Sequence, residues 1–97
     1  MKSTEEILER LRQARPLLAR DFGVKRIAVF GSYARGEQRA DSDVDVLVEV
    51  DPSIGLRFVD LADRIESLLG VRTDVVSRRA ISPRHWAVIE KELVDAA

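Results

Sequence analysis

The fold is decided between residues 25 and 50, which read KRIAVFGSYARGEQRADSDVDVLVEV. The first part, Lys25 to Phe30, is short, apolar and partly β-branched, which predicts a buried strand. From Asp43 to Val50 the two faces alternate with the period of two that predicts a second strand. Between these strands, Gly31 to Gly36 predicts a turn or a single helical turn, and Gln38 to Ser42 predicts a polar loop.

Helical patterns flank this stretch on both sides. Ser3 and Glu6 have the spacing of a capping box, and apolar residues then recur at helical spacing up to a stop at Gly23. Pro16 is expected to kink or split this helix, because its ring opposes the preceding turn. Three further elements are predicted downstream: a helix from Leu56 to Leu69 closed by Gly70, a strand from Arg72 to Ser77, and a helix that starts at Ser82-Pro83 and runs to the C-terminus.

The composition and the order of elements indicate one small globular domain. The 97 residues are 45% apolar and 34% charged, with a formal net charge of -1. We expect an α/β (α+β) fold class, with a small mixed β-sheet packed against helices in a single domain over residues 1–97. The charge shows no strongly basic face, so no direct nucleic-acid binding is expected. The lack of cysteine, of a signal peptide and of a long apolar run predicts a cytoplasmic protein without membrane contact.

Three aspartates, Asp43, Asp45 and Asp74, are the candidate catalytic and metal-binding residues. Asp43 and Asp45 are two positions apart on a predicted strand, so both side chains point to one face. Asp74 is the one acidic residue of the third predicted strand, where apolar neighbours favour a compensating cation. Converging carboxylates are the ligands of two-metal phosphoryl-transfer sites. On spacing alone, a solvated strand edge explains Asp41, Asp43 and Asp45 equally well. A calcium-binding EF-hand loop is excluded, because Val46 and Pro52 stand where that loop requires glycine and glutamate.

The candidate nucleotide-binding residues are Gly31, Ser32 and Arg35, in the turn after the first strand. Such a turn can aim backbone N–H groups and a hydroxyl at phosphate oxygens, and an arginine can neutralise a triphosphate. A P-loop is excluded, because Glu37 and Gln38 stand where that motif requires lysine and serine or threonine. A Gly-Ser turn by itself is also ordinary loop chemistry. Its combination with the three aspartates predicts a triphosphate cradle opposite a cluster of metal-binding carboxylates.

Taken together, these residues resemble the minimal nucleotidyltransferase (MNT) domains of the DNA polymerase β superfamily. The signature of that superfamily is Gly-Ser, a stretch of about ten residues, Asp-x-Asp, and a third aspartate on a later strand. In this chain the signature reads Gly31-Ser32, then Asp43-Val44-Asp45, then Asp74 within Val71-Arg72-Thr73-Asp74-Val75. The resemblance extends over nearly the whole chain.

The resemblance implies a mechanism with two Mg²⁺ ions and ATP as the substrate. Asp43 and Asp45 would each bind Mg²⁺, and Asp74 would complete the metal site that activates an incoming hydroxyl. Ser32 and the nearby backbone would hold the terminal phosphates while the hydroxyl attacks the α-phosphate and pyrophosphate leaves. All three acidic positions are intact in this chain.

Single-domain members of this length resemble the antitoxins of HEPN–MNT toxin–antitoxin pairs. Such antitoxins transfer AMP from ATP to a tyrosine of the HEPN toxin, so the resemblance implies a hetero-oligomer with a HEPN partner in the cytoplasm. The chain has too little mass for an acceptor pocket of its own, and a partner that carries the hydroxyl would supply one. Two alternatives stay open: an antitoxin that neutralises its partner by binding alone, and a nucleotidyltransferase that acts on a small molecule or an RNA end.

Overall fold

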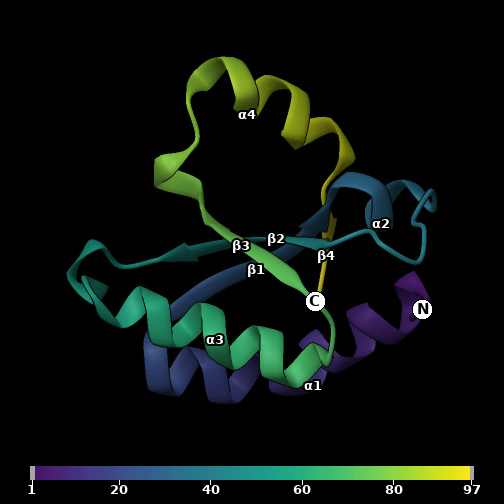
Figure 1. Ribbon diagram of the computed structural model, residues 1–97. Helices are drawn as coiled ribbons and strands as arrows, with labels where there is room; N and C mark the ends of the chain where they lie inside the picture. Colours follow the sequence, from purple (N-terminus) through teal and green to yellow (C-terminus); the bar gives the residue numbers. More distant parts are fainter. Residues whose placement is uncertain (1, 97) are drawn as a thin grey trace.

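A four-stranded mixed sheet is the centre of the protein, in a computed structural model that describes residues 2–96 (Figure 1). The strands are β1 (Val24–Phe30), β2 (Val44–Val50), β3 (Thr73–Ser77) and β4 (Val94–Asp95), in the spatial order β3-β2-β1-β4. β1 is antiparallel to both β2 and β4, whereas β2 and β3 are parallel. The expected small mixed sheet packed against helices is therefore confirmed.

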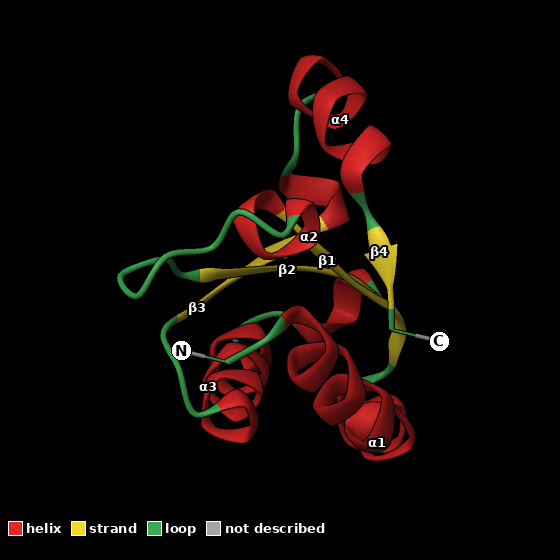
Figure 2. Ribbon diagram, turned by 90° about the vertical axis from the view of Figure 1, so that its right-hand side faces the viewer, coloured by secondary structure: helices red, strands yellow, loops and turns green. Residues whose placement is uncertain are grey.

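The two long helices cover one face of this sheet, and the short helices lie on the other face. Figure 2 shows α1 (Thr4–Phe22) and α3 (Arg57–Leu69) side by side below the sheet, and α2 (Gly31–Arg35) and α4 (Pro83–Ile89) above it. Short 3-10 turns follow β2, β3 and α4, at 52–54, 78–80 and 90–92. No helix within the described residues is both long and apolar enough to cross a membrane.

The apolar core lies between the sheet and the two long helices. Alternate residues of β2 point toward the helices, and residues at helical spacing on α3 point back. Many of these side chains are fully buried, among them Leu11, Leu18, Val44, Val46, Val48, Leu61, Ile65 and Leu69. Burial of each large one stabilises the fold by about 1.5–3 kcal/mol. This packed layer is the rigid base from which the opposite face of the sheet presents its polar side chains.

The predicted ends of the first helix, α1, agree with the structure. The Ser3 hydroxyl accepts a hydrogen bond from the Glu6 N–H, and the Glu6 carboxylate accepts one from the Ser3 N–H, so the capping box is present. Gly23 ends α1 in the left-handed conformation, at φ 69°. α1 continues through Pro16 over 19 residues, so the expected split is wrong. Pro16 is exposed, and the packed apolar face of the helix continues on both sides of it.

The C-terminal part of the chain differs from its prediction. α4 ends at Ile89 instead of running to the C-terminus, and residues 94–95 form β4 along the edge of β1. The Ala96 N–H donates to the Ile27 carbonyl at 3.0 Å, and Ala96 is buried. Arg26 on β1 binds both carboxylate oxygens of Asp95, at 2.7 and 3.0 Å. Pairing with this strand edge overrides the helical spacing of the local sequence.

Candidate active site

The turn between β1 and α2 brings the backbone of Gly31 against the side chain of Asp45. Phe30, the last residue of β1, is in register with Asp45 on β2, so the chain leaves its strand beside that carboxylate. Gly31 has φ 73°, a left-handed conformation that favours glycine. A Cβ at this position would overlap Asp45 Oδ2 and lie 3.1 Å from Asp45 Cγ. The fold therefore requires glycine at position 31 for two reasons, the positive φ angle of the backbone and the Asp45 carboxylate beside it.

The parallel pairing of β2 and β3 places Asp45 directly beside Asp74. The two residues are partners in the strand register, although 29 positions separate them in the sequence. Asp45 is half-buried and Asp74 is exposed. Adjacent parallel strands run about 4.8 Å apart, so neighbouring side chains on the same face can meet. The strand register thus brings Asp45 of the Asp-x-Asp segment next to the lone aspartate of the third strand.

Asp43 lies just outside β2, which begins at Val44 rather than at the predicted Asp43. Its carboxylate forms an ion pair with Arg72, with 3.2 Å between Asp43 Oδ1 and Arg72 Nε. Arg72 also donates to the backbone carbonyl of Asp41 at 3.2 Å. Both members of the ion pair are at least half exposed, so the pair adds little to stability. The Asp43 side chain can leave Arg72 at small cost.

The electrostatics of the site are those of crowded negative charge. Burial raises the pKa of Asp45 above its ordinary value, and the charges of Asp74, Asp43 and Glu92 raise it further, while Arg35 acts in the opposite direction. A divalent cation would relieve this repulsion, and carboxylate oxygens are the ligands that Mg²⁺ prefers. Within residues 2–96, no three His, Cys, Asp or Glu side chains already have the arrangement of a metal site. The carboxylates of Asp43, Asp45 and Asp74 therefore fit a divalent cation in charge and in chemistry. In this structure the Asp43 side chain points to Arg72 instead.

The predicted nucleotide-binding residues lie beside the carboxylates, and one further side chain joins them. The Gly31 N–H donates to Glu92 Oε1 at 3.0 Å. Arg35 donates to Glu92 Oε2 at 2.9 Å and to Glu37 at 2.8 Å, and these bonds raise the pKa of Arg35, Glu92 contributing most. Ser32 is half-buried, and its carbonyl accepts from the Glu37 N–H. Glu92 therefore belongs to the site, at the end of the 3-10 turn that precedes β4.

Glu92 and Arg72 are the residues that sequence reasoning missed. Glu92 falls in the segment predicted to be a helix that runs to the C-terminus, and nothing local indicates that it reaches Gly31, which is 61 positions away. Arg72 carries a weak signal, because it stands two residues before Asp74 at the start of the third strand. A cation next to a cluster of aspartates is a natural partner for one of them.

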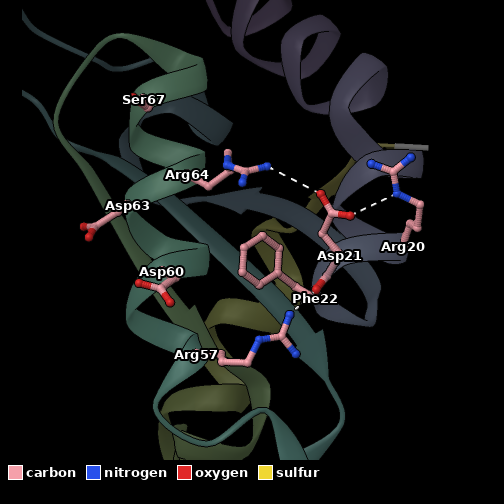
Figure 3. A pocket seen from close by; sticks show the side chains of 8 residues that line it. All are labelled: Arg20, Asp21, Phe22, Arg57, Asp60, Asp63, Arg64 and Ser67. Atoms are coloured by element: carbon pink, nitrogen blue, oxygen red, sulfur yellow. Dashed lines mark hydrogen bonds and ion pairs between the residues drawn. The ribbon is translucent and has the colours of Figure 1, made fainter.

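A separate groove between the end of α1 and α3 contains none of the predicted site residues (Figure 3). Two of its arginines are paired with one carboxylate, because Asp21 forms ion pairs with Arg20 at 2.9 Å and with Arg64 at 3.6 Å. Arg57 and Arg64 also lie over the ring of Phe22, with 5.4 and 5.5 Å from each guanidinium carbon to the ring centre. Carboxylates crowd together around Asp45 on the other face of the sheet, which makes that face the better candidate for metal-dependent chemistry.

Comparisons with known proteins identify the family to which the chain belongs. The nucleotidyltransferase domain family matches residues 5–96. A relative from Methanocaldococcus jannaschii, named as a protein adenylyltransferase, is 39% identical over 97% of this chain and 98% of its own length. The protein adenylyltransferase MntA of Thermococcus cleftensis is 41% identical over 97% of this chain and 96% of its own length.

Two solved structures share the fold, and the first of them is of closely similar size. One, described as a minimal nucleotidyltransferase, has a TM-score of 0.80 and 38% identity, and the match covers 96% of this chain and 95% of that one. The other, a toxin–antitoxin structure with AMP-PNP, has a TM-score of 0.65 and 25% identity, and the match covers 99% of this chain and 73% of that one. The chain described here belongs to the nucleotidyltransferase domain family and is an enzyme of that class, with the fold of the minimal nucleotidyltransferases.

Proposed function

We propose that this chain is an antitoxin that transfers AMP from ATP to a hydroxyl, that of a tyrosine, on a HEPN-domain toxin in the cytoplasm. In this proposal residues 1–97 act as one minimal nucleotidyltransferase domain in a hetero-oligomer with the toxin. The observation that carries the proposal is the position of Asp45, between Asp74 on the neighbouring strand and the backbone of Gly31. A carboxylate pair beside a phosphate-binding turn is what transfer of a nucleotidyl group requires.

Asp43, Asp45 and Asp74 would hold two Mg²⁺ ions, which supply charge neutralisation at the transferred phosphate and promote ionisation of the attacking hydroxyl. Asp45 connects the metal-binding and the phosphate-binding parts of the site, because it adjoins both Asp74 and the Gly31 turn. Asp43 contributes after its carboxylate leaves Arg72. Breaking the ion pair with Arg72 costs little free energy, since the pair is exposed.

Gly31, Ser32 and Arg35 would bind the β- and γ-phosphates of ATP. The tyrosine oxygen then forms a bond to the α-phosphorus, the bond from that phosphorus to the bridging oxygen breaks, and pyrophosphate leaves with the electron pair. Asp74 is exposed at the edge of the site and accepts the proton of the hydroxyl. The exposure of Asp74 supports a large acceptor, because a hydroxyl on another protein can approach it from solvent.

The relatives support a protein as the acceptor. Two that match almost the whole chain are named as protein adenylyltransferases, and one similar structure is of a toxin–antitoxin system with an ATP analogue. The resemblance to HEPN–MNT pairs adds the class of toxin. A formal charge of -1 argues against an RNA end as the acceptor, since RNA is held by basic surfaces.

The experiment is to incubate the purified chain with its HEPN partner, ATP and Mg²⁺, and to measure the intact mass of the partner. We expect a gain of one or more AMP groups, located on a tyrosine by peptide mass spectrometry, and no gain with EDTA. Asp63→Asn, on the far face of α3, is the matched control and keeps the transfer. A partner whose mass stays unchanged with the wild-type chain would refute the proposal.

The double variant Asp43→Asn with Asp45→Asn separates catalysis from neutralisation by contact. We expect it to bind the toxin, to transfer no AMP and to leave the toxin active. If this variant neutralises the toxin as well as the wild type does, contact alone is sufficient and the proposed role of catalysis is wrong. Circular dichroism confirms that the variant is folded.

A further inference from the structure

Glu92 occupies two of the donors that the proposed function assigns to phosphate, those of Gly31 and Arg35. One of its carboxylate oxygens accepts from the Gly31 N–H at 3.0 Å, and the other accepts from Arg35 Nη1 at 2.9 Å. Charge-assisted hydrogen bonds of this length are the stronger kind. The carboxylate thus bridges the backbone and the cationic side chain of the same turn.

The surroundings of Glu92 hold it in this position. Its side chain is only 23% exposed, whereas that of Arg35 is 46% exposed. Glu92 ends the 3-10 turn at 90–92, and β4 begins two residues later and is fixed to β1. The backbone on its C-terminal side is therefore anchored, and the carboxylate is delivered to Gly31 by the fold.

A backbone N–H donates one strong hydrogen bond, so a phosphate oxygen and Glu92 cannot both use the Gly31 N–H in full. A triphosphate next to Glu92 also faces a like charge, in a region where Asp43, Asp45 and Asp74 are already negative. Binding of the nucleotide through this turn must then move the Glu92 carboxylate away. The Glu92 carboxylate and a phosphate are both negatively charged acceptors, and they compete for the same hydrogen-bond donors.

We propose that Glu92 is an internal competitor for the triphosphate, and that its release from Gly31 and Arg35 sets the affinity of the chain for ATP. The inference rests on the proposed function, because it assumes that the nucleotide binds at the Gly31 turn. It assigns to Glu92 a control of nucleotide affinity rather than a part in the chemistry.

The test is the Kd of a non-hydrolysable ATP analogue with Mg²⁺, measured by calorimetry for the wild type, Glu92→Gln and Glu37→Gln. Glutamine keeps an acceptor for Gly31 but removes the charge, so Glu92→Gln is expected to bind about three- to five-fold more tightly, as a partly exposed ion pair allows. Glu37 bonds Arg35 but not Gly31, so Glu37→Gln is the matched control, with a smaller change. Equal or weaker binding by Glu92→Gln would overturn the inference, and weaker binding would make Glu92 a positioning residue or a ligand.

A second measurement uses the wild-type chain alone and so does not depend on how a variant folds. When inorganic triphosphate is added, the Gly31 amide signal in a ¹⁵N spectrum is expected to shift. The signal of the Glu92 side-chain carboxyl carbon, in a ¹³C spectrum, is expected to shift with it. Binding of triphosphate that leaves the Glu92 signal unchanged contradicts the inference but not the proposed function. If the wild type binds no nucleotide at all, both fail together.

Discussion

Replacing Gly31 with alanine tests the close contact between the Gly31 backbone and the Asp45 carboxylate. The new methyl group would overlap Asp45 Oδ2 and lie 3.1 Å from Asp45 Cγ, and the backbone would be held at φ 73°. A left-handed alanine costs about 1–2 kcal/mol. Overpacking against a fixed neighbour adds about 1–3 kcal/mol. We therefore expect Gly31→Ala to lower the free energy of unfolding by about 2–5 kcal/mol.

Gly36→Ala is the matched control for the backbone angle. Gly36 lies at the other end of α2 with φ 70°, and a Cβ there would meet no atom within 4 Å. Its substitution should cost only the conformational part, about 1–2 kcal/mol. The difference between the two variants then measures the contact between residue 31 and Asp45.

The assays are urea unfolding and the rate of AMP transfer. Gly31→Ala should reduce the rate by at least about a hundredfold, because displacement of a reacting group by about 1 Å has that effect. Gly36→Ala should retain transfer. The reasoning is refuted if the two variants lose the same stability and Gly31→Ala keeps the wild-type rate.

Two further predictions concern stability. Arg26 lowers the pKa of Asp95, so this ion pair stabilises the fold above the unfolded pKa near 3.8, and the contribution is lost as the pH falls through the lower folded value. Asp95→Asn should cost about 0.5–1 kcal/mol at neutral pH, as expected of a half-exposed pair, and the deficit in Tm relative to the wild type should shrink below about pH 4. An equal deficit at pH 3 and pH 7 would contradict this. Leu61→Ala, in the buried core, should lower the free energy of unfolding in urea by about 2–5 kcal/mol. Leu56→Ala, at a side chain that is 92% exposed, should leave it almost unchanged. Similar losses of stability for the two variants would show that burial does not set the difference.

The elements that the sequence predicts well are those with local signals. The period of two between residues 43 and 50 is that of β2, and the glycines at 23 and 70 end their helices in the left-handed conformation. The position of Asp74 beside Asp45 follows from the parallel pairing of β2 and β3. The burial expected for Asp74 from its apolar neighbours is wrong, because its side chain is exposed.

The parts that could not be predicted depend on contacts between distant residues. β4 exists because residues 94–95 meet the free edge of β1, and Arg26 reaches Asp95 across 69 positions. Arg35 binds Glu92 across 57 positions. Local spacing favours a helix through this segment, and only the folded sheet offers the competing strand edge.

The account depends on Asp45 and Asp74 sharing divalent cations beside the Gly31 turn. The most direct measurement is the number of Mn²⁺ ions bound in the presence of a non-hydrolysable ATP analogue, counted by electron paramagnetic resonance for the wild type, Asp45→Asn, Asp74→Asn and Asp63→Asn. We predict two ions for the wild type and for Asp63→Asn, and at least one fewer for each of the other two variants. If Asp45→Asn and Asp74→Asn bind as many ions as the wild type with the same affinity, these aspartates do not form the metal site.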